Sequence, residues 1–583
     1  MNGGGENLFP KQGHFLTGRR AAMLAVGWLI LVCLLVHAPT FHGLQSPDAM
    51  KYADAARNFL AGKGFVVNQI QPRSLAGRHY TERLPADRIR EPLTRHFGYP
   101  LVLVGAFALL GASDQIVFLV SCLLWILTGC LLFLLGRQIH SAAVGLLALL
   151  LYSLQSKTVA FAVAGTAEML CLALILGGGC LIVARRRPYA AAVAAGFLGA
   201  FALFVRQPMM YVVPICYVGF LSLRRDRHLR TFALLIVGAV VFYGAYLLAR
   251  PHFFPPPAPF AGQPVAIEKP SRPAPEEPRR NALEAFLYRV LGAQFLLFSN
   301  RFPGHTLERS LVDPTAGAQP ATESFFAKMR FNAVLLAKAL AYKTGSPLLS
   351  LLFLLSAIAV WKDRTMRRLI VTVIVLTAVT SVVCLSLFVM DRYFQIYLPF
   401  LALVIAGALV HWRETSARFT ARRRTALVAL VVVLASLPLP FGHFIAPALG
   451  DASLRDLAAD TRTRKDAIAS LLVRRTDKED IVFSDLPWLT GWYANRPSIW
   501  LPLDPADVAE LMRWVKADYL LLTLEDPQGF WVWRDWLMSY KSGKLDKTWA
   551  EWKLIDGSMT NGRGIYLFQH RVDSPGKLTG DHL

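Results

Sequence analysis

The residues of this sequence that could do chemistry are charged side chains at the edges of long apolar segments. The chain has no phosphate-binding Walker loop, no GxGxxG opening a helix, no HExxH and no nucleophile elbow. These absences exclude the common soluble cofactor enzymes. A charge beside lipid is costly, so its presence there suggests a function. Four such residues stand out: Asp48, Glu168, Arg206 and Arg392.

Asp48 follows the first apolar segment and lies in SPDAMKYADAARNFLAGKGF, which predicts a short helix. Ser46 is its expected N-cap and Pro47 its first residue. Asp48 and Tyr52 share one face of that helix, whereas Asp54 lies off that face and is expected to be solvated. A carboxylate here can take a proton from a hydroxyl while a leaving group departs. The alternative is that Asp48 only complements the helix dipole.

Arg206 and Arg392 stand at the ends of two apolar segments, in FVRQP and DRYFQIYLP. A guanidinium at headgroup depth suits a phosphate, because its fork binds two oxygens. Contact with ordinary lipid headgroups is the alternative for each. Tyr393, next to Arg392, is either an interfacial aromatic residue or a substrate contact.

Two glutamates complete the set of candidates. Glu168 opens an apolar segment after AVAGTA, where it either marks a helix start or faces a cavity. Glu91 precedes Pro92 in a stretch rich in arginine, where a salt bridge is the simplest interpretation and acceptor or metal binding the alternative.

Composition indicates a polytopic α-helical membrane protein. Of 583 residues, 54% are hydrophobic and only 17% are charged, and the mean hydropathy is +0.41. About 20 apolar residues cross a bilayer as a helix. We predict about 11 transmembrane helices, at 20–39, 116–136, 141–156, 167–184, 189–205, 208–223, 231–249, 346–361, 369–389, 394–410 and 425–443.

The formal net charge of +23 is explained by topology, which weighs against nucleic acid as a partner. With the N-terminus in the cytoplasm, the inside segments hold 20 basic residues and four acids. The positive-inside rule then holds at every short loop, and the C-terminus lies outside. We expect a multi-pass membrane protein with a cytoplasmic N-terminus and a C-terminus on the outer side of the membrane.

Two domains are expected: a transmembrane domain, 1–445, with large outer loops at 40–115 and 250–345, and a periplasmic α/β domain, 446–583. In the first loop, 98–111 is apolar but short, which predicts an interfacial or re-entrant helix. In the second, a proline-rich linker precedes another interfacial helix at 283–298. Nine of the 13 tryptophans lie in the C-terminal domain, where core packing is favoured over stacking on sugar rings.

All seven cysteines fall in predicted spans, so no disulfide framework is expected. They do not show the spacing and the His or Cys companions of a zinc site. The cofactor is therefore unknown: a divalent metal stays open as an alternative, but no ligand spacing supports it.

The order and sidedness of these motifs carry a resemblance to a known family. The first loop with SPDAMKYADAARNFLAGKGF and REPLTRHFGYPLVLVGAFALLG, then Glu168, Arg206-Gln207-Pro208 and Asp391-Arg392-Tyr393, resemble the bacterial GT-C fold membrane glycosyltransferases that use polyprenyl-phosphate sugars. Protein O-mannosyltransferases and the lipid A aminoarabinose transferase belong to this group. The resemblance covers about residues 15–445, and the C-terminal domain is similar to tails of bacterial members.

The resemblance implies an inverting hexosyl- or pentosyltransferase that moves a sugar from a polyprenyl-phosphate carrier to an acceptor hydroxyl at the outer face of the membrane. The membrane would be a bacterial inner (cell) membrane, with the C-terminus periplasmic or extracellular. The acceptor would be a lipid, glycan or protein of the cell envelope. Asp48 matches the catalytic acid, Arg392 and Arg206 match residues that hold the donor phosphate, and Tyr52, Glu91, Glu168 and Tyr393 are the expected substrate-binding residues. Many members have two adjacent acids where this chain has only Asp48. A transporter or flippase, or a non-catalytic assembly partner, for lipid-linked saccharides is the alternative.

Overall fold

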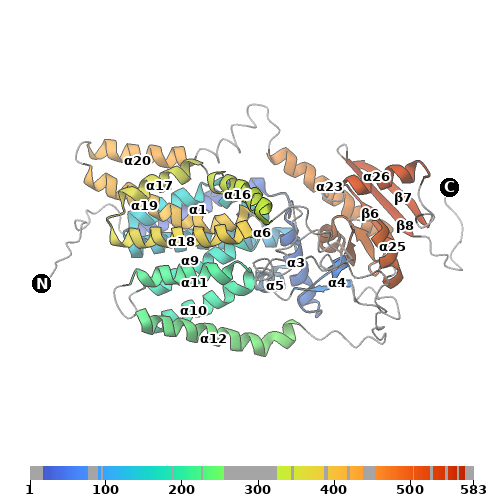
Figure 1. Cartoon of the computed structure of the whole chain (residues 1–583), viewed down its shortest axis with the longest axis horizontal. Helices are drawn as coiled ribbons and strands as arrows, with labels where there is room; N and C mark the ends of the chain where they lie inside the picture. The colour runs from blue at the N-terminus through green and yellow to red at the C-terminus, as the bar shows by residue number, and fades with distance from the viewer. Residues whose placement is uncertain are drawn as a thin grey trace.

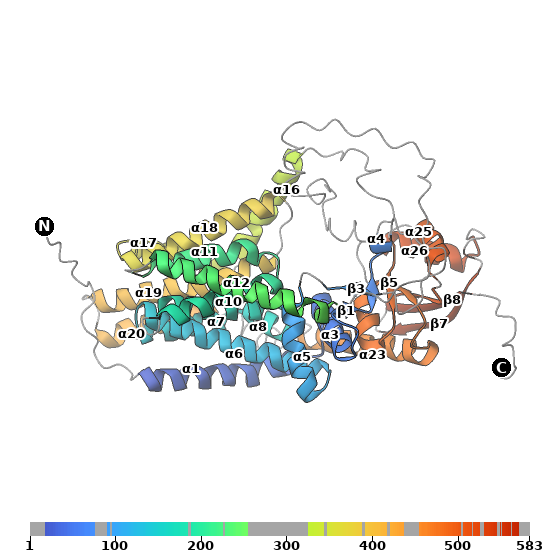
Figure 2. The ribbon, with the colours of Figure 1, turned by 90° about the horizontal axis from the view of Figure 1, so that it is seen from below.

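The structure is a computed structural model in which helices form an elongated bundle and a mixed sheet lies at one end (Figures 1 and 2). It describes residues 18–75, 90–93, 96–184, 188–224, 228–254, 325–342, 347–386, 391–416, 420–436, 454–502, 505–515, 517–524, 530–544, 549, 551–560 and 563–570. The expected proline-rich linker and the expected helix at 283–298 lie outside the described residues.

Each of the eleven predicted spans coincides with a helix. The first is a composite of α1 (Gly18–Val32), the π-helix η1 (Cys33–His37) and α2 (Ala38–Thr40). The others begin with α6 (Asp114–Ile139), α7 (Ala142–Ser153), α9 (Glu168–Val183), α10 (Pro188–Val205), α11 (Met209–Ser222) and α12 (His228–Phe253). They end with α17 (Pro347–Ala359), α18 (Arg364–Ser386), α19 (Leu398–Thr415) and α20 (Ala421–Ser436).

The lengths of the helices and their exposed apolar surfaces agree with a membrane environment. Among the described residues, six helices are long and apolar enough to cross a bilayer, and α7 with α8 (Ser156–Ala164), bent by 68°, is a seventh candidate. Four shorter apolar helices accompany them. Only 17% of the apolar window of α12 is buried, an exposure that lipid accommodates and water does not. How many helices cross stays a prediction.

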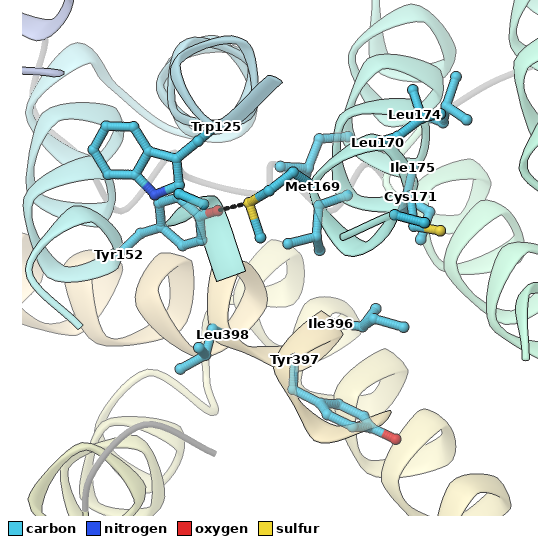
Figure 3. Close-up of a cluster of buried hydrophobic side chains, with 14 of the residues drawn as sticks. Trp125, Tyr152, Met169, Leu170, Cys171, Leu174, Ile175, Ile396, Tyr397 and Leu398 are labelled. Atoms are coloured by element: carbon cyan, nitrogen blue, oxygen red, sulfur yellow. Dashed lines mark hydrogen bonds between the residues drawn. The ribbon is translucent and has the colours of Figure 1, made fainter. Parts of the chain in front are cut away.

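The bundle is held together by side-chain packing around α9. Figure 3 shows one part of this core, in which Tyr152 of α7 donates a hydrogen bond to Met169 Sδ (3.7 Å) and Trp125 of α6 lies beside them. Ile396 and Tyr397 face the same region from the 3-10 helix η4 (Asp391–Tyr397), which packs against α9. A helix of 18 residues, α16 (Phe325–Tyr342), packs beside α18.

Small elements of the first loop lie between the bundle and the sheet (Figure 2). The helix predicted from Ser46 is confirmed as α3 (Pro47–Leu60), and the apolar 98–111 segment forms α5 (Gly98–Leu110), which packs on α3. Between them lie β1 (Val66–Val67), β2 (Gln69–Ile70), α4 (Pro72–Leu75) and β3 (Glu91–Pro92). Strands β1 and β3 pair antiparallel.

The C-terminal part is an α/β unit with six strands in the order β2-β5-β4-β6-β8-β7. Strands β2, β5, β4 and β6 are parallel, and β8 and β7 are antiparallel. Its own elements are α23 (Leu454–Arg475), β4 (Val482–Ser484), α24 (Pro487–Leu489), the π-helix η6 (Thr490–Ala494), β5 (Ser498–Trp500), α25 (Pro505–Trp514), β6 (Tyr519–Leu522), α26 (Phe530–Lys541), β7 (Trp552–Thr560) and β8 (Arg563–His570). The expected α/β class is confirmed, and the boundary at 445/446 stays a prediction because β2 comes from the first loop.

Core packing accounts for most tryptophans of the C-terminal part. Six of the nine are buried: Trp492, Trp500, Trp533, Trp536, Trp549 and Trp552. Several form one aromatic cluster, in which the Trp536 and Trp549 rings lie 4.9 Å apart. The indoles of this cluster contact one another and Phe568 of β8, so they are not available to stack on a sugar.

Close packing of α10 on α12 yields a first prediction. A Cβ on Gly238 of α12 would overlap the backbone oxygen of Val193, whereas one on Gly244 of the same helix would meet no atom within 4 Å. Alanine in a helix is intrinsically better than glycine by about 0.5–1 kcal/mol, but overpacking costs about 1–3 kcal/mol. Gly238→Ala should therefore lower the thermal unfolding midpoint in detergent, and Gly244→Ala should leave it equal or higher. Equal midpoints for both variants would contradict this packing.

Candidate functional site

The main candidate site is an ionic cluster of Asp48, Glu168 and Arg206. The Arg206 guanidinium donates one hydrogen bond to Glu168 Oε1 and a second, 3.4 Å long, to Asp48 Oδ2. Arg206 and Glu168 are 8% and 4% exposed, whereas the Asp48 side chain is 29% exposed. Asp48 is therefore the member of the cluster that a substrate can reach.

Local sequence determines where each member stands. Asp48 is the second residue of α3, after the extended Ser46 and after Pro47 at the first helical position. Glu168 is the first residue of α9, three residues after Gly165, whose φ of +70° allows the reversal that ends α8. Arg206 directly follows α10, and Pro208 disfavours continuation of that helix. Three element ends thus meet at one point.

Electrostatics keeps the guanidinium charged. Burial lowers the pKa of Arg206, but the neighbouring Glu168, Tyr52 and Asp48 raise it, and the net shift is upward. A buried cation without partners would cost several kcal/mol, so the two carboxylates are required to balance it. With both acids ionised, the cluster carries one net negative charge. Asp48 is the more exposed of the two carboxylates, so water solvates its charge best.

Two aromatic residues line this cluster. Tyr52 lies one turn after Asp48 on α3 and is 5% exposed. Its ring meets that of Tyr99, from α5, edge to face at 5.6 Å between centroids. The structure therefore brings four of the sequence-predicted residues together: Asp48, Tyr52, Glu168 and Arg206.

The other predicted site residues lie elsewhere or are described only in part. Glu91 is opposite Val67 in the β1–β3 pair. Asn58, near the end of α3, donates to Val66 O (3.0 Å). Because ten residues of helix span about 15 Å, Glu91 is near the far end of α3 from Asp48. Tyr393 is half-buried in η4; Arg392 belongs to the same 3-10 helix, but its side chain lies outside the described residues.

The expectation that Asp54 is solvated is wrong. Asp54 is 3% exposed and accepts hydrogen bonds from Arg57 (2.7 Å) and from the backbone and side chain of Asn68 (2.5 and 3.1 Å). Burial raises the pKa of Asp54, and the opposite charge of Arg57 acts against that rise. Asp54 therefore fastens α3 to the strands of the first loop.

Arg57 extends the same network into the C-terminal part. Its guanidinium donates to the carbonyl oxygens of Trp492 (2.8 Å) and Gly491 (2.6 Å) in η6. It also stacks over the Trp492 indole, 4.8 Å from the ring centroid. Contacts with the segment TGWYA of the C-terminal part thus hold the helix that carries Asp48.

Asp114, at the start of α6, is a second anchor between the two parts. It accepts hydrogen bonds from Trp492 Nε1 (2.7 Å), the Tyr493 hydroxyl (2.6 Å) and Leu44 N (3.2 Å). Gly43 is needed there, because it has a φ of +88° and its Cβ would lie 2.9 Å from Asp114 Oδ2. Sequence reasoning missed these contacts because each joins residues far apart in the chain.

Comparison with known proteins identifies the fold. Residues 95–251 match the family described as dolichyl-phosphate-mannose-protein mannosyltransferase, a segment that includes Glu168 and Arg206. The crystal structure of ArnT from Cupriavidus metallidurans bound to undecaprenyl phosphate matches with a TM-score of 0.51, over 94% of this chain and 98% of that chain, at 12% identity. This chain has the GT-C fold. The fold expected from the resemblance is thus confirmed.

Other GT-C structures match more weakly. The oligosaccharyltransferase of Archaeoglobus fulgidus in the apo form has a TM-score of 0.48 at 10% identity, over 88% of this chain and 70% of that chain. The same organism's AglB with an inhibitory peptide and a dolichol-phosphate also has a TM-score of 0.48 at 10% identity, over 94% and 74%. No curated protein matches the chain by sequence.

The contact between α3 and η6 generates a second prediction. Arg57→Ala leaves the Asp54 carboxylate buried without its cation, and breaking such a pair costs about 3–5 kcal/mol. We expect a clear drop in the thermal unfolding midpoint and faster limited proteolysis. The matched control is Arg462→Ala, which removes an exposed i,i+4 pair with Asp466 and should change stability by about 0.5 kcal/mol or less. Equal effects of the two variants would show that the network does not hold α3.

Proposed function

We propose that this protein is an inverting membrane glycosyltransferase that moves a sugar from a polyprenyl-phosphate carrier to an acceptor hydroxyl at the outer face of the membrane. The observation that supports it best is the ionic cluster, in which one half-exposed carboxylate, Asp48, is paired to a buried guanidinium. The matched mannosyltransferase family and the GT-C structure with undecaprenyl phosphate support this class of donor.

The proposed reaction needs one proton acceptor. The acceptor oxygen attacks the anomeric carbon, its proton passes to Asp48, and the bond between that carbon and the phosphate oxygen breaks with its electron pair leaving on the phosphate. Attack from the face opposite the leaving group inverts the anomeric configuration. Because phosphate leaves readily, the protein mainly has to orient the base and stabilise the departing anion.

Arg206 has two proposed duties. Its contacts with Glu168 and Asp48 orient the Asp48 carboxylate, and its guanidinium is also proposed to donate hydrogen bonds to the donor phosphate. Arg392 is the second proposed phosphate ligand. Its helix η4 packs against α9, the helix that begins with Glu168, and this contact supports the assignment. Tyr52 and Tyr393 are proposed to line the donor, and Glu91 the acceptor side.

The arrangement of helix ends supports an outer-face reaction. Glu168, Arg206 and Asp114 stand at the ends of α9, α10 and α6 that approach the C-terminal part, whereas Arg137 stands at the opposite end of α6. By the positive-inside rule the basic ends are cytoplasmic. We therefore propose that the cluster and the C-terminal part are periplasmic, with a lipid, glycan or protein acceptor reaching Asp48 from that side.

A third prediction tests the proposed base. Asp48→Asn keeps the size of the side chain but cannot take a proton, so turnover should fall by about 10²–10⁴-fold. Turnover is measured as release of undecaprenyl phosphate from a panel of undecaprenyl-phosphate-linked hexoses and pentoses, with purified protein in nanodiscs. Asp466→Asn, an exposed carboxylate on α23, is the matched control and should retain full activity.

Binding of undecaprenyl phosphate, compared with turnover, distinguishes a transferase from a flippase or an assembly partner. Asp48→Asn should still show a rise in unfolding temperature on addition of undecaprenyl phosphate, as a binding-competent protein does. Normal turnover by Asp48→Asn would contradict the role of Asp48. Binding without turnover of any donor by the wild-type protein would favour a flippase or an assembly partner over a transferase.

A further inference from the structure

Two cysteines and a histidine meet inside the bundle, away from the ionic cluster. Cys33 and His37 lie four residues apart in the π-helix η1, and Cys122 comes from the facing helix α6. The distance from His37 Nδ1 is 3.4 Å to Cys33 Sγ and 3.9 Å to Cys122 Sγ. Within the part of the chain that the structure describes, this is the one group of three possible metal ligands.

We propose that Cys33, His37 and Cys122 form a metal site for a soft or borderline transition-metal ion, of which Zn²⁺ fits best. In a tetrahedral zinc site, bonds of about 2.3 Å to sulfur and 2.0–2.1 Å to nitrogen place sulfur and nitrogen about 3.5 Å apart. The two separations in the structure bracket this value, and all three ligand atoms lie within 4.8 Å of one another. Small side-chain shifts therefore suffice to close the site.

The burial of the ligands and the π-helical backbone of η1 support a functional role for this cluster. His37 is fully buried and Cys122 is 7% exposed. The segment is also a single turn of π-helix inside an otherwise α-helical span, a feature often found at functional sites.

The summed charge of the three ligands indicates which metal ion fits the site. Two thiolates and a neutral imidazole carry two negative charges, so a divalent ion gives a neutral complex that the apolar interior tolerates. A monovalent copper ion would leave a buried negative charge. Magnesium and calcium prefer oxygen ligands, which this site lacks among its described residues. Three protein ligands leave a fourth position of zinc for water or another ligand.

The site would tie the π-helix η1, which continues α1, to α6. Helix α1 leads through α2 to Asp48, and α6 begins at Asp114, the anchor of the C-terminal part. A metal bridge between these helices would stabilise the frame of the ionic cluster without touching substrate. This inference does not rest on the proposed glycosyl transfer, because it requires only the three ligands and their packing.

Metal analysis of the full chain tests the proposal. The wild-type protein, purified in detergent without a histidine tag or chelator, should retain about one zinc per chain by inductively coupled plasma mass spectrometry. Exchange with Co²⁺ should give thiolate-to-cobalt charge-transfer absorbance. Cys33→Ser and Cys122→Ser should each lose the metal and the absorbance. Cys130→Ser, a half-buried cysteine two turns further along α6, is the control and should keep both.

Two results would overturn the metal site. One is wild-type protein that contains no zinc and develops no charge-transfer band with Co²⁺, a measurement that does not depend on whether the variants fold. The other is a disulfide between Cys33 and Cys122, found by non-reducing peptide mass spectrometry in protein isolated without reductant. That bond would make the cluster a redox pair.

Discussion

The buried guanidinium of Arg206 is the interaction on which the proposed site depends. A cation at this depth is tolerated only because Glu168 and Asp48 balance it. These two acids come from separate elements, the start of α9 and the start of α3. The pairing is satisfied only when both elements are in place, so assembly of the bundle and assembly of the site are one event.

The first loop connects the bundle to the C-terminal part. Its helix α3 carries Asp48 at one end and the Asp54–Arg57 pair on its next turns, and its strand β2 forms the edge of the C-terminal sheet. Through Arg57 and Asp114, the π-helix η6 contacts both α3 and α6. The C-terminal part is thus a structural support for the helix that bears the proposed base.

Sequence could predict the features that depend on local pattern. Apolar length predicted a helix at every span, and Ser46 and Pro47 predicted the start of α3. The α/β class of the C-terminal part was predicted as well. The two-residue strand β2 was missed because so short a segment has no periodicity, and its partner β5 is more than 400 residues away.

Long-range polar contacts were beyond prediction from one sequence. Asp54 has the local appearance of a solvated residue, but Asn68 and the η6 carbonyl groups bury its pair with Arg57. Sequence analysis recognised no zinc-site companions for the cysteines and passed over the four-residue spacing of Cys33 and His37, because Cys122 joins them only through helix packing. Arg206 was expected at a phosphate, and the structure adds that its charge is already shared by two carboxylates.

The most direct measurement is an experimental structure of the full chain in a lipid nanodisc with undecaprenyl phosphate. We expect the phosphate at the helix ends where Asp48, Glu168 and Arg206 meet, within hydrogen-bond distance of Arg206 or Arg392. A phosphate bound at the opposite, basic ends of the helices would contradict the proposed site.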